Sequence, residues 1–152
     1  MDISHPANAL PLAYLQRRGA HAPLLAPPDS SPRPYDSLDS HPDVVARVWD
    51  GLGRALPEDC RWIVCGTPAL VQPTSGVLLA LALGTQYALR LPGGLADKAA
   101  GRGWKTVTTW AGGSQLDTRL ELGAEWVFGN YTDEELAWVR QAFQVYAAPP
   151  GS

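Results

Sequence analysis

Apolar residues recur every three or four positions in residues 42–56 and 132–147, which is the spacing of one buried face of a helix. Helix-start signals precede both segments. Ser40 with Asp43, and Thr132 with Glu135, have the spacing of a capping box, in which two side chains satisfy backbone N–H groups of the first turn. The sequence therefore predicts a helix near residue 42 and a second helix at the C-terminal end.

Between these helices, the apolar runs 77–83 and 86–91 flank Gly84-Thr85, a dipeptide typical of a tight β-hairpin turn. Glycine at the first turn position favours type II′, because it adopts a positive φ at little cost. The resulting register pairs Leu83 with Gln86, Ala82 with Tyr87, Leu81 with Ala88, Ala80 with Leu89 and Leu79 with Arg90. Strict alternation puts Leu78 on the face of Tyr87, and Leu79 on the opposite face. The first strand is apolar on both faces, so we expect it to be central and covered on both sides.

Shorter segments complete the predicted fold. Three further strands are predicted, at 61–65, 104–110 and 124–128, and the first of them can continue at 69–71. A short helix is predicted at 114–122. Residues 92–103 allow one or two helical turns. We therefore predict an α+β fold with a largely antiparallel sheet of about four to five strands, centred on the 77–91 hairpin and packed against helices at 42–56 and 132–147.

The first part of the chain differs from the rest. Eight of the 14 prolines lie in the first 42 residues. We expect a partly flexible, proline-rich arm over residues 1–41, followed by a single domain over residues 42–148. Residues 9–18 have the composition of a short helix, or of an arm that packs on the domain through Leu12, Tyr14 and Leu15.

Charge and hydropathy narrow the classes of partner. The net charge is −3, Lys98 and Lys105 are the only lysines, and the arginines are scattered, so a nucleic-acid surface is not expected. The longest apolar run has seven residues, against about 20 for a membrane-spanning helix. The N-terminus lacks the pattern of a secretory signal, and we expect a cytoplasmic protein. Cys60 and Cys65 flank a predicted strand and are expected to be reduced thiols.

Catalytic signatures are absent from the main part of the chain. Residues 43–152 contain no histidine, which removes the usual general base and the usual metal ligand. No nucleotide-binding loop is present, and no cofactor or metal is expected. The run Asp133–Glu135 is explained by helix capping. Glu125 and Asp117 remain candidates for an acid or a base, because their separation in space cannot be read from the sequence.

Candidate binding residues lie on predicted strands and loops. Trp104, Trp110 and Trp126 lie near glycine-rich turns and suggest an aromatic surface, although all six tryptophans could instead fill the core. Arg90 stands among aliphatic residues and requires a carboxylate partner, either from this chain or from another molecule. Asn130 and Tyr131 belong to the loop before the last helix, and such loops often carry function, although a plain connecting turn is the alternative.

These observations favour a small binding domain that contacts a protein partner through an aromatic surface, as an inhibitor or accessory protein does. The alternative is a carboxylate-dependent hydrolase or lyase that acts on a small molecule or sugar and uses Glu125 or Asp117. The missing nucleophile and base disfavour an enzyme without excluding it.

Overall fold

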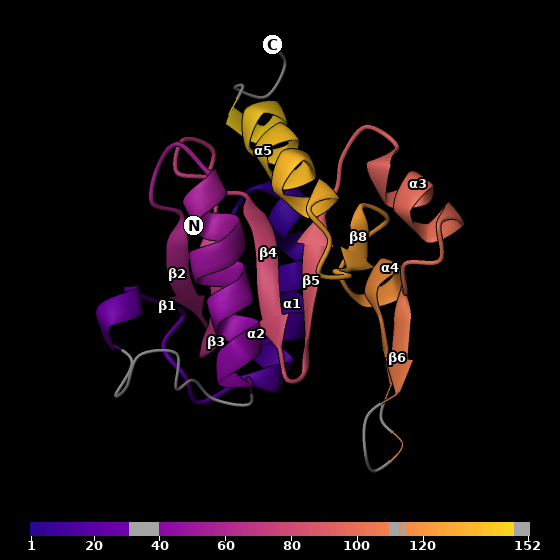
Figure 1. Cartoon of the computed structure of the whole chain (residues 1–152). Helices are drawn as coiled ribbons and strands as arrows, with labels where there is room; N and C mark the ends of the chain where they lie inside the picture. The colour runs from indigo at the N-terminus through magenta and orange to yellow at the C-terminus, as the bar shows by residue number, and fades with distance from the viewer. Residues whose placement is uncertain (31–39, 110–112, 114, 148–152) are drawn as a thin grey trace.

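The computed structural model describes residues 1–30, 40–109, 113 and 115–147. Its main feature is a six-stranded antiparallel sheet, in the order β1-β2-β3-β4-β5-β8 (Figure 1). The strands are β1 Leu25–Ala26, β2 Arg61–Val64, β3 Thr67–Val71, β4 Leu78–Leu83, β5 Gln86–Arg90 and β8 Trp126–Phe128. A separate two-stranded sheet pairs β6 (Val107–Thr109) with β7 (Gln115–Asp117). The predicted α+β class is confirmed.

The central hairpin has the predicted register from Leu83–Gln86 to Ala80–Leu89. Gly84 has φ +68°, whereas Thr85 has no positive φ, which agrees with a type II′ turn. The register is determined by the turn itself, so it could be predicted from the two residues that form it.

Beyond Ala80 the strict alternation was wrong. The β3–β4 pairing shifts between Leu70 and Val71, so that Leu70 faces Ala80 but Val71 faces Leu78. The extra residue on β4, Leu79, is the mark of a β-bulge, which reverses the faces of the residues beyond it. Leu79 consequently packs with the cluster that contains Tyr87, and Leu78 packs on the other side.

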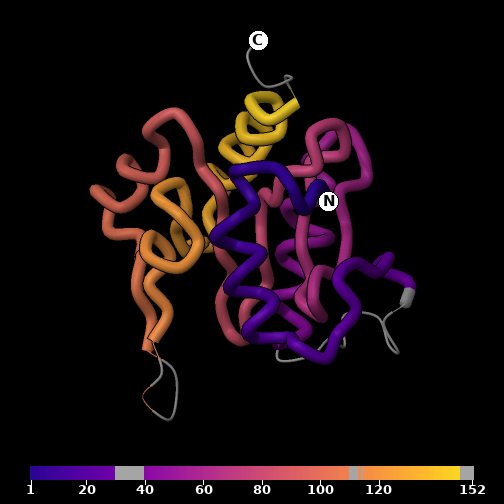
Figure 2. The backbone as a smooth tube through the Cα atoms, turned by 180° about the vertical axis from the view of Figure 1, so that it is seen from behind, coloured from indigo at the N-terminus to yellow at the C-terminus, as the bar shows by residue number. Residues whose placement is uncertain are grey.

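Helices cover both faces of the sheet. The front cluster joins the sheet to the helical segment 42–55, α3 (Leu95–Gly101) and α5 (Glu134–Ala147). On the back, seen in Figure 2, α1 (Ala9–Arg18) covers the sheet, with its axis roughly along the strands, beside α4 (Thr118–Glu121). Every residue of β4 is buried, as expected of a strand covered on both sides. Among the described residues, no helix has the length and apolar character needed to cross a membrane.

The helix predicted at 42–56 is one helical segment with three kinds of turn. It consists of α2 (Pro42–Ala46), the π-helical η3 (Arg47–Leu52) and the 3₁₀ turn η4 (Gly53–Ala55). Ser40 does not cap it, contrary to our prediction. The Ser40 hydroxyl donates to the Ala82 carbonyl over 2.9 Å, and the His41 imidazole instead accepts the Asp43 N–H over 3.1 Å.

The N-terminal residues that the structure describes pack on the domain. Leu12 and Leu15 of α1 are buried, as the composition of residues 9–18 suggested, and β1 pairs with β2. Asn8 is fully buried and ties this segment to the start of β4: its amide group donates to the Asp2 and Gly76 carbonyls, and its Oδ1 accepts the Leu78 N–H. The rest of the predicted arm, residues 31–39, lies outside the described residues.

Three local predictions require correction. Strand β3 begins at Thr67, because Cys65 and Gly66, both with positive φ, form a two-residue turn after β2. Of the strand predicted at 104–110, only 107–109 pairs within the described residues. Residues 115–117, predicted as helix, form β7, and Asp117 then caps α4 by accepting the N–H groups of Arg119 and Leu120.

Candidate functional site

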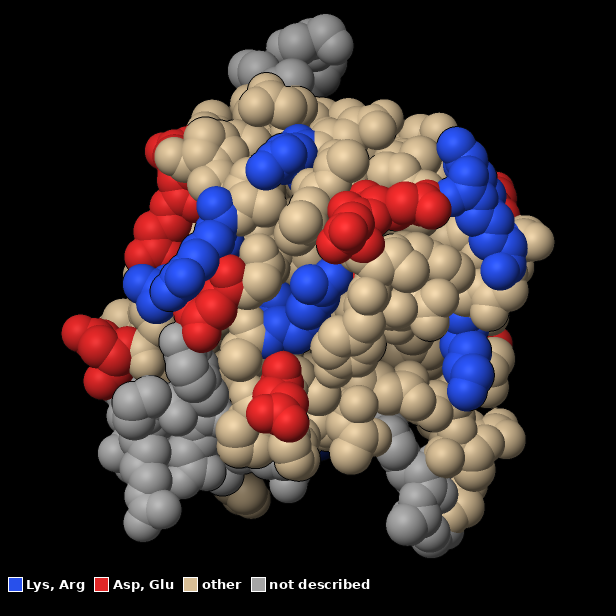
Figure 3. Space-filling view, viewed as in Figure 1, with Lys and Arg blue, Asp and Glu red and all other residues tan. Residues whose placement is uncertain are grey.

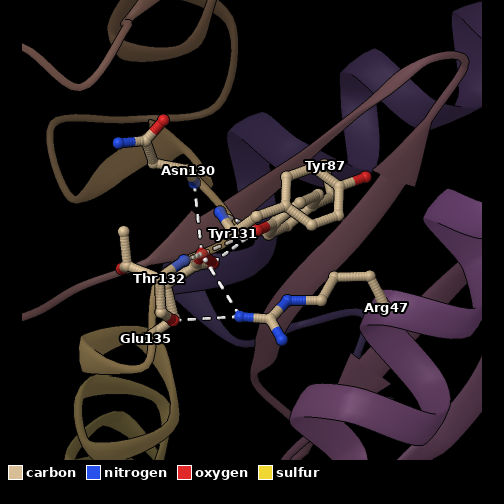
Figure 4. Close-up of polar contacts among 6 residues, drawn as sticks. All are labelled: Arg47, Tyr87, Asn130, Tyr131, Thr132 and Glu135. Carbon is tan, nitrogen blue, oxygen red and sulfur yellow. Dashed lines mark hydrogen bonds and ion pairs between the residues drawn. The ribbon is translucent and has the colours of Figure 1, made fainter.

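A buried polar cluster joins β5, the β8–α5 loop, the first turn of α5 and the helical segment 42–55 (Figure 4). Its centre is Glu135, whose side chain is fully buried. The carboxylate accepts the backbone N–H groups of Thr132 over 2.8 Å and Asn130 over 3.2 Å. The Tyr87 hydroxyl lies 2.7 and 2.6 Å from the two carboxylate oxygens. A buried charge is tolerated only when it is surrounded by donors in this way.

The capping box predicted for α5 is formed in one direction only. Glu135 accepts the Thr132 N–H, as a capping box requires. The Thr132 hydroxyl, however, is buried and finds no partner among the described residues. The Glu135 side chain therefore stabilises the β8–α5 loop and the Tyr87 hydroxyl as well as the first turn of α5.

Arg47 supplies the positive charge next to this carboxylate. Its Nη2 donates to the Thr132 carbonyl over 3.0 Å and lies 3.4 Å from Glu135 Oε1. Burial acts to lower the pKa of Arg47, but interactions with Tyr87 and Glu135 outweigh it and the pKa is raised. Burial and the adjacent carboxylate likewise raise the pKa of Tyr87, so this hydroxyl stays protonated.

Tyr131 is an exposed member of the cluster, as is Asn130. The Tyr131 side chain is 57% exposed, and its backbone has φ +54°, a conformation rare for residues other than glycine. The Tyr131 N–H donates to the Tyr87 hydroxyl over 2.8 Å. The two rings meet edge to face with centroids 4.9 Å apart, and the Arg47 guanidinium lies 5.7 Å from the Tyr131 centroid. The loop thus holds an exposed ring in a defined position.

Gly129 permits this arrangement. A Cβ at position 129 would lie 1.8 Å from Cε2 of Tyr87, a distance that neither residue can accommodate without moving. The Gly129 N–H also donates to the Tyr87 carbonyl over 2.9 Å. The β8–α5 loop therefore approaches the Tyr87 ring more closely than any other residue type at position 129 would allow.

Arg90, the second predicted site, lies on the back of the sheet and is 4% exposed. Its internal carboxylate partner is Glu125, at 3.4 Å, which also accepts a hydrogen bond from the Tyr146 hydroxyl. The guanidinium lies 4.9 Å from the Trp126 centroid and 5.4 Å from the Tyr146 centroid. It also donates to the carbonyls of Leu78 and Ala7, each over 2.7 Å. Arg90 thus connects β4, β8, α5 and the N-terminal segment.

The tryptophans do not form the expected aromatic surface in the described part of the chain. Trp126 is fully buried, and Trp104 is buried against Trp138 with centroids 5.0 Å apart. Trp49 is also buried, as the helical pattern suggested. Trp110 lies outside the described residues. Tryptophan has a large apolar area, so packing layers on both sides of a sheet bury it wherever it faces them.

The structure places the two candidate catalytic carboxylates in different surroundings. Asp117 caps α4, whereas Glu125 lines the pocket beside Arg90, and no other carboxylate is among the described residues that line this pocket. Paired-carboxylate hydrolysis requires both groups at one site. Among the described residues, no group of three or more His, Cys, Asp or Glu side chains is placed to hold a metal ion.

Sequence reasoning reached Asn130, Tyr131 and Arg90 but missed the residues that hold them. The partners Arg47 and Tyr146 lie far from these residues in the chain, and nothing in the local pattern points to them. The capping spacing did locate Glu135. A tyrosine on a buried strand or helix face, such as Tyr87 or Tyr146, is a further signal, because its hydroxyl requires a partner. Comparison of the chain with protein-family models, curated proteins and solved structures finds no match.

Proposed function

We propose that this chain is a small protein-binding domain whose contact surface is centred on Tyr131. The supporting observation is a large aromatic side chain that is both exposed and held in a left-handed backbone conformation by a buried hydrogen-bond network. Tyrosine is among the residues that contribute most to binding energy at protein interfaces. This proposal replaces the tryptophan surface expected from the sequence with a single tyrosine.

The backbone conformation of Tyr131 is costly, which supports a role for the side chain. A non-glycine residue in a sparsely populated conformation costs on the order of 1–3 kcal/mol, and such residues cluster at functional sites. The loop offsets that cost through the Tyr87 hydroxyl and the Glu135 carboxylate. A ring that is already ordered loses little conformational entropy when it binds.

An exposed carboxylate near Tyr131 would suit a partner that presents a basic side chain. Partial burial raises the pKa of Tyr131; among the neighbouring charges Arg47 has the largest effect and lowers it, while Glu135 and Asp43 raise it. The Asp43 carboxylate is largely exposed. On the face shown in Figure 3, basic and acidic side chains are interspersed, without the basic stripe that a nucleic acid requires. A lysine or arginine of the partner would contact the ring of Tyr131 and the Asp43 carboxylate. We further propose that binding takes place in the cytoplasm.

Affinity capture with matched variants tests this proposal. Tyr131→Asn removes the ring but keeps a residue that tolerates positive φ, and Val145→Asn alters a comparably exposed apolar residue on α5. Both variants and the native protein are immobilised, exposed to lysate of the source organism and compared by quantitative mass spectrometry. We expect proteins that the native protein and Val145→Asn both capture to be depleted about tenfold by Tyr131→Asn, and to be released by salt.

Equal capture by all three proteins would contradict the proposal, as would the absence of any protein enriched over an unrelated bait. Urea unfolding of Tyr131→Asn provides the control for folding, because the substitution relieves backbone strain and is expected to leave stability within about 1 kcal/mol.

A further inference from the structure

A small pocket lies beside Arg90, on the opposite side of the sheet from Tyr131. Its volume is about 220 Å³. The N-terminal segment contributes Pro6 and Leu10, and the α4–β8 connection contributes Leu122 and Glu125. Pockets for drug-sized ligands typically span about 300–1,000 Å³, so this pocket suits a single smaller molecule.

Two residues with buried donors, Arg90 and Trp126, line this pocket. Among the described residues, the three nitrogens of Arg90 donate one hydrogen bond each, to Leu78, Glu125 and Ala7, and Tyr146 is a further partner of the guanidinium, which has five N–H groups in all. The indole N–H of Trp126 is buried and finds no partner among the described residues. Buried donors are rarely left unsatisfied, and those that are require an explanation.

The charge of Arg90 is also only partly compensated. Its carboxylate partner Glu125 stands at 3.4 Å, which is long for a charge-assisted hydrogen bond, and shares its oxygen with Tyr146. Burial lowers the pKa of Arg90, and the effects of Tyr146 and Glu125 do not fully restore it. An additional negative group in the pocket would therefore stabilise the guanidinium.

We propose that this pocket binds an apolar α-amino acid, with the carboxylate on Arg90, the ammonium group facing Glu125 and the side chain against Leu10 and Leu122. The pocket offers one positive and one negative group side by side next to an apolar wall. A simple carboxylate would be repelled by Glu125, and a simple amine by Arg90. A ligand that carries both charges avoids both penalties.

Isothermal titration calorimetry with L-valine, L-leucine and L-phenylalanine tests the ligand class. We expect at least one of the three to bind saturably. Its amide, which lacks the carboxylate, and its N-acetyl derivative, which lacks the ammonium group, should each bind at least about tenfold more weakly. The proposal is overturned if none of the three amino acids binds, or if the amide or the N-acetyl derivative binds as tightly as the parent compound.

Variants that keep Arg90 in place locate the site. Glu125→Gln removes the charge that faces the ammonium group and that also pairs with Arg90, while its amide oxygen can still accept a hydrogen bond from the guanidinium, and we expect affinity to fall about tenfold. Leu10→Gln alters the exposed apolar wall and should lower affinity about fivefold, whereas Leu120→Gln alters an exposed leucine of α4 that does not line the pocket. Binding that is unaffected by Glu125→Gln and Leu10→Gln, or equally affected by Leu120→Gln, would show that the ligand binds elsewhere. Tyr131→Asn is expected to leave amino-acid binding unchanged, which separates this site from the proposed protein-binding surface.

Discussion

The Tyr87→Phe substitution removes a single oxygen atom that connects β5, α5 and the loop between β8 and α5. In the native protein this hydroxyl is shared between the two oxygens of Glu135, at 2.7 and 2.6 Å. It also accepts the Tyr131 N–H over 2.8 Å. The phenylalanine ring fills the same space, so the change isolates the polar contacts from the packing.

The expected loss of stability follows from those two contacts. A hydrogen bond to a charged group contributes about 1.5–3 kcal/mol, and a donor left unsatisfied costs about 1–3 kcal/mol. The loss should be smaller than the sum of these two contributions. Glu135 still accepts hydrogen bonds from the N–H groups of Thr132 and Asn130, and the Tyr131 N–H lies near solvent, which can replace the lost acceptor. We expect a loss of about 3 kcal/mol, a large fraction of the roughly 5–15 kcal/mol that stabilises a typical domain.

Urea unfolding followed by tryptophan fluorescence measures this loss. Tyr14→Phe is the control, because that hydroxyl belongs to a partly exposed residue of α1, and it should change stability by less than about 0.5 kcal/mol. In a double-mutant cycle with Glu135→Gln, the coupling energy should exceed about 1 kcal/mol. A loss below about 1 kcal/mol for Tyr87→Phe, or additive effects of the two substitutions, would refute the role assigned to the hydroxyl.

Three further outcomes are expected. Gly129→Ala should lower the free energy of unfolding, measured in urea, by about 3 kcal/mol, because its Cβ would lie 1.8 Å from the Tyr87 ring. The control Gly101→Ala, with open space around it, should be neutral or slightly stabilising. Equal effects of the two substitutions would contradict the close approach of Gly129 to Tyr87. Asn8→Ala should lower the free energy of unfolding by about 3 kcal/mol, because the buried amide makes three hydrogen bonds, to the Asp2 and Gly76 carbonyls and the Leu78 N–H. The N-terminal segment should then become accessible to protease. Unchanged proteolysis would contradict this anchoring role. Burial and Glu125 raise the pKa of Tyr146 from 10.0 to about 12, so between these pH values the folded state retains a proton that the unfolded state loses. The free energy of unfolding should therefore fall as pH rises across this interval. Urea unfolding at increasing pH should show a smaller fall for Tyr146→Phe than for the native protein.

Interactions between residues close together in the chain could be predicted from the sequence. The hairpin register from Leu83–Gln86 to Ala80–Leu89 follows from the Gly84 turn, and the α5 helix follows from its apolar spacing and the Thr132–Glu135 contact. Each depends on a few consecutive residues whose conformations are restricted locally. The location of the Tyr131 loop before α5 followed from the same local signals.

Contacts between distant residues were decided by the tertiary structure alone. Tyr87 and Glu135 are 48 positions apart, Arg90 and Glu125 are 35 apart, and Asn8 and Leu78 are 70 apart. The bulge at Leu79, the burial of Trp126 and the pocket beside Arg90 likewise depend on which element packs against which face of the sheet. Turns and caps are short-range interactions encoded in neighbouring residues. The partners of a buried charge or an aromatic ring depend instead on how whole layers stack, because many side chains could satisfy the same group and only the packed arrangement selects among them.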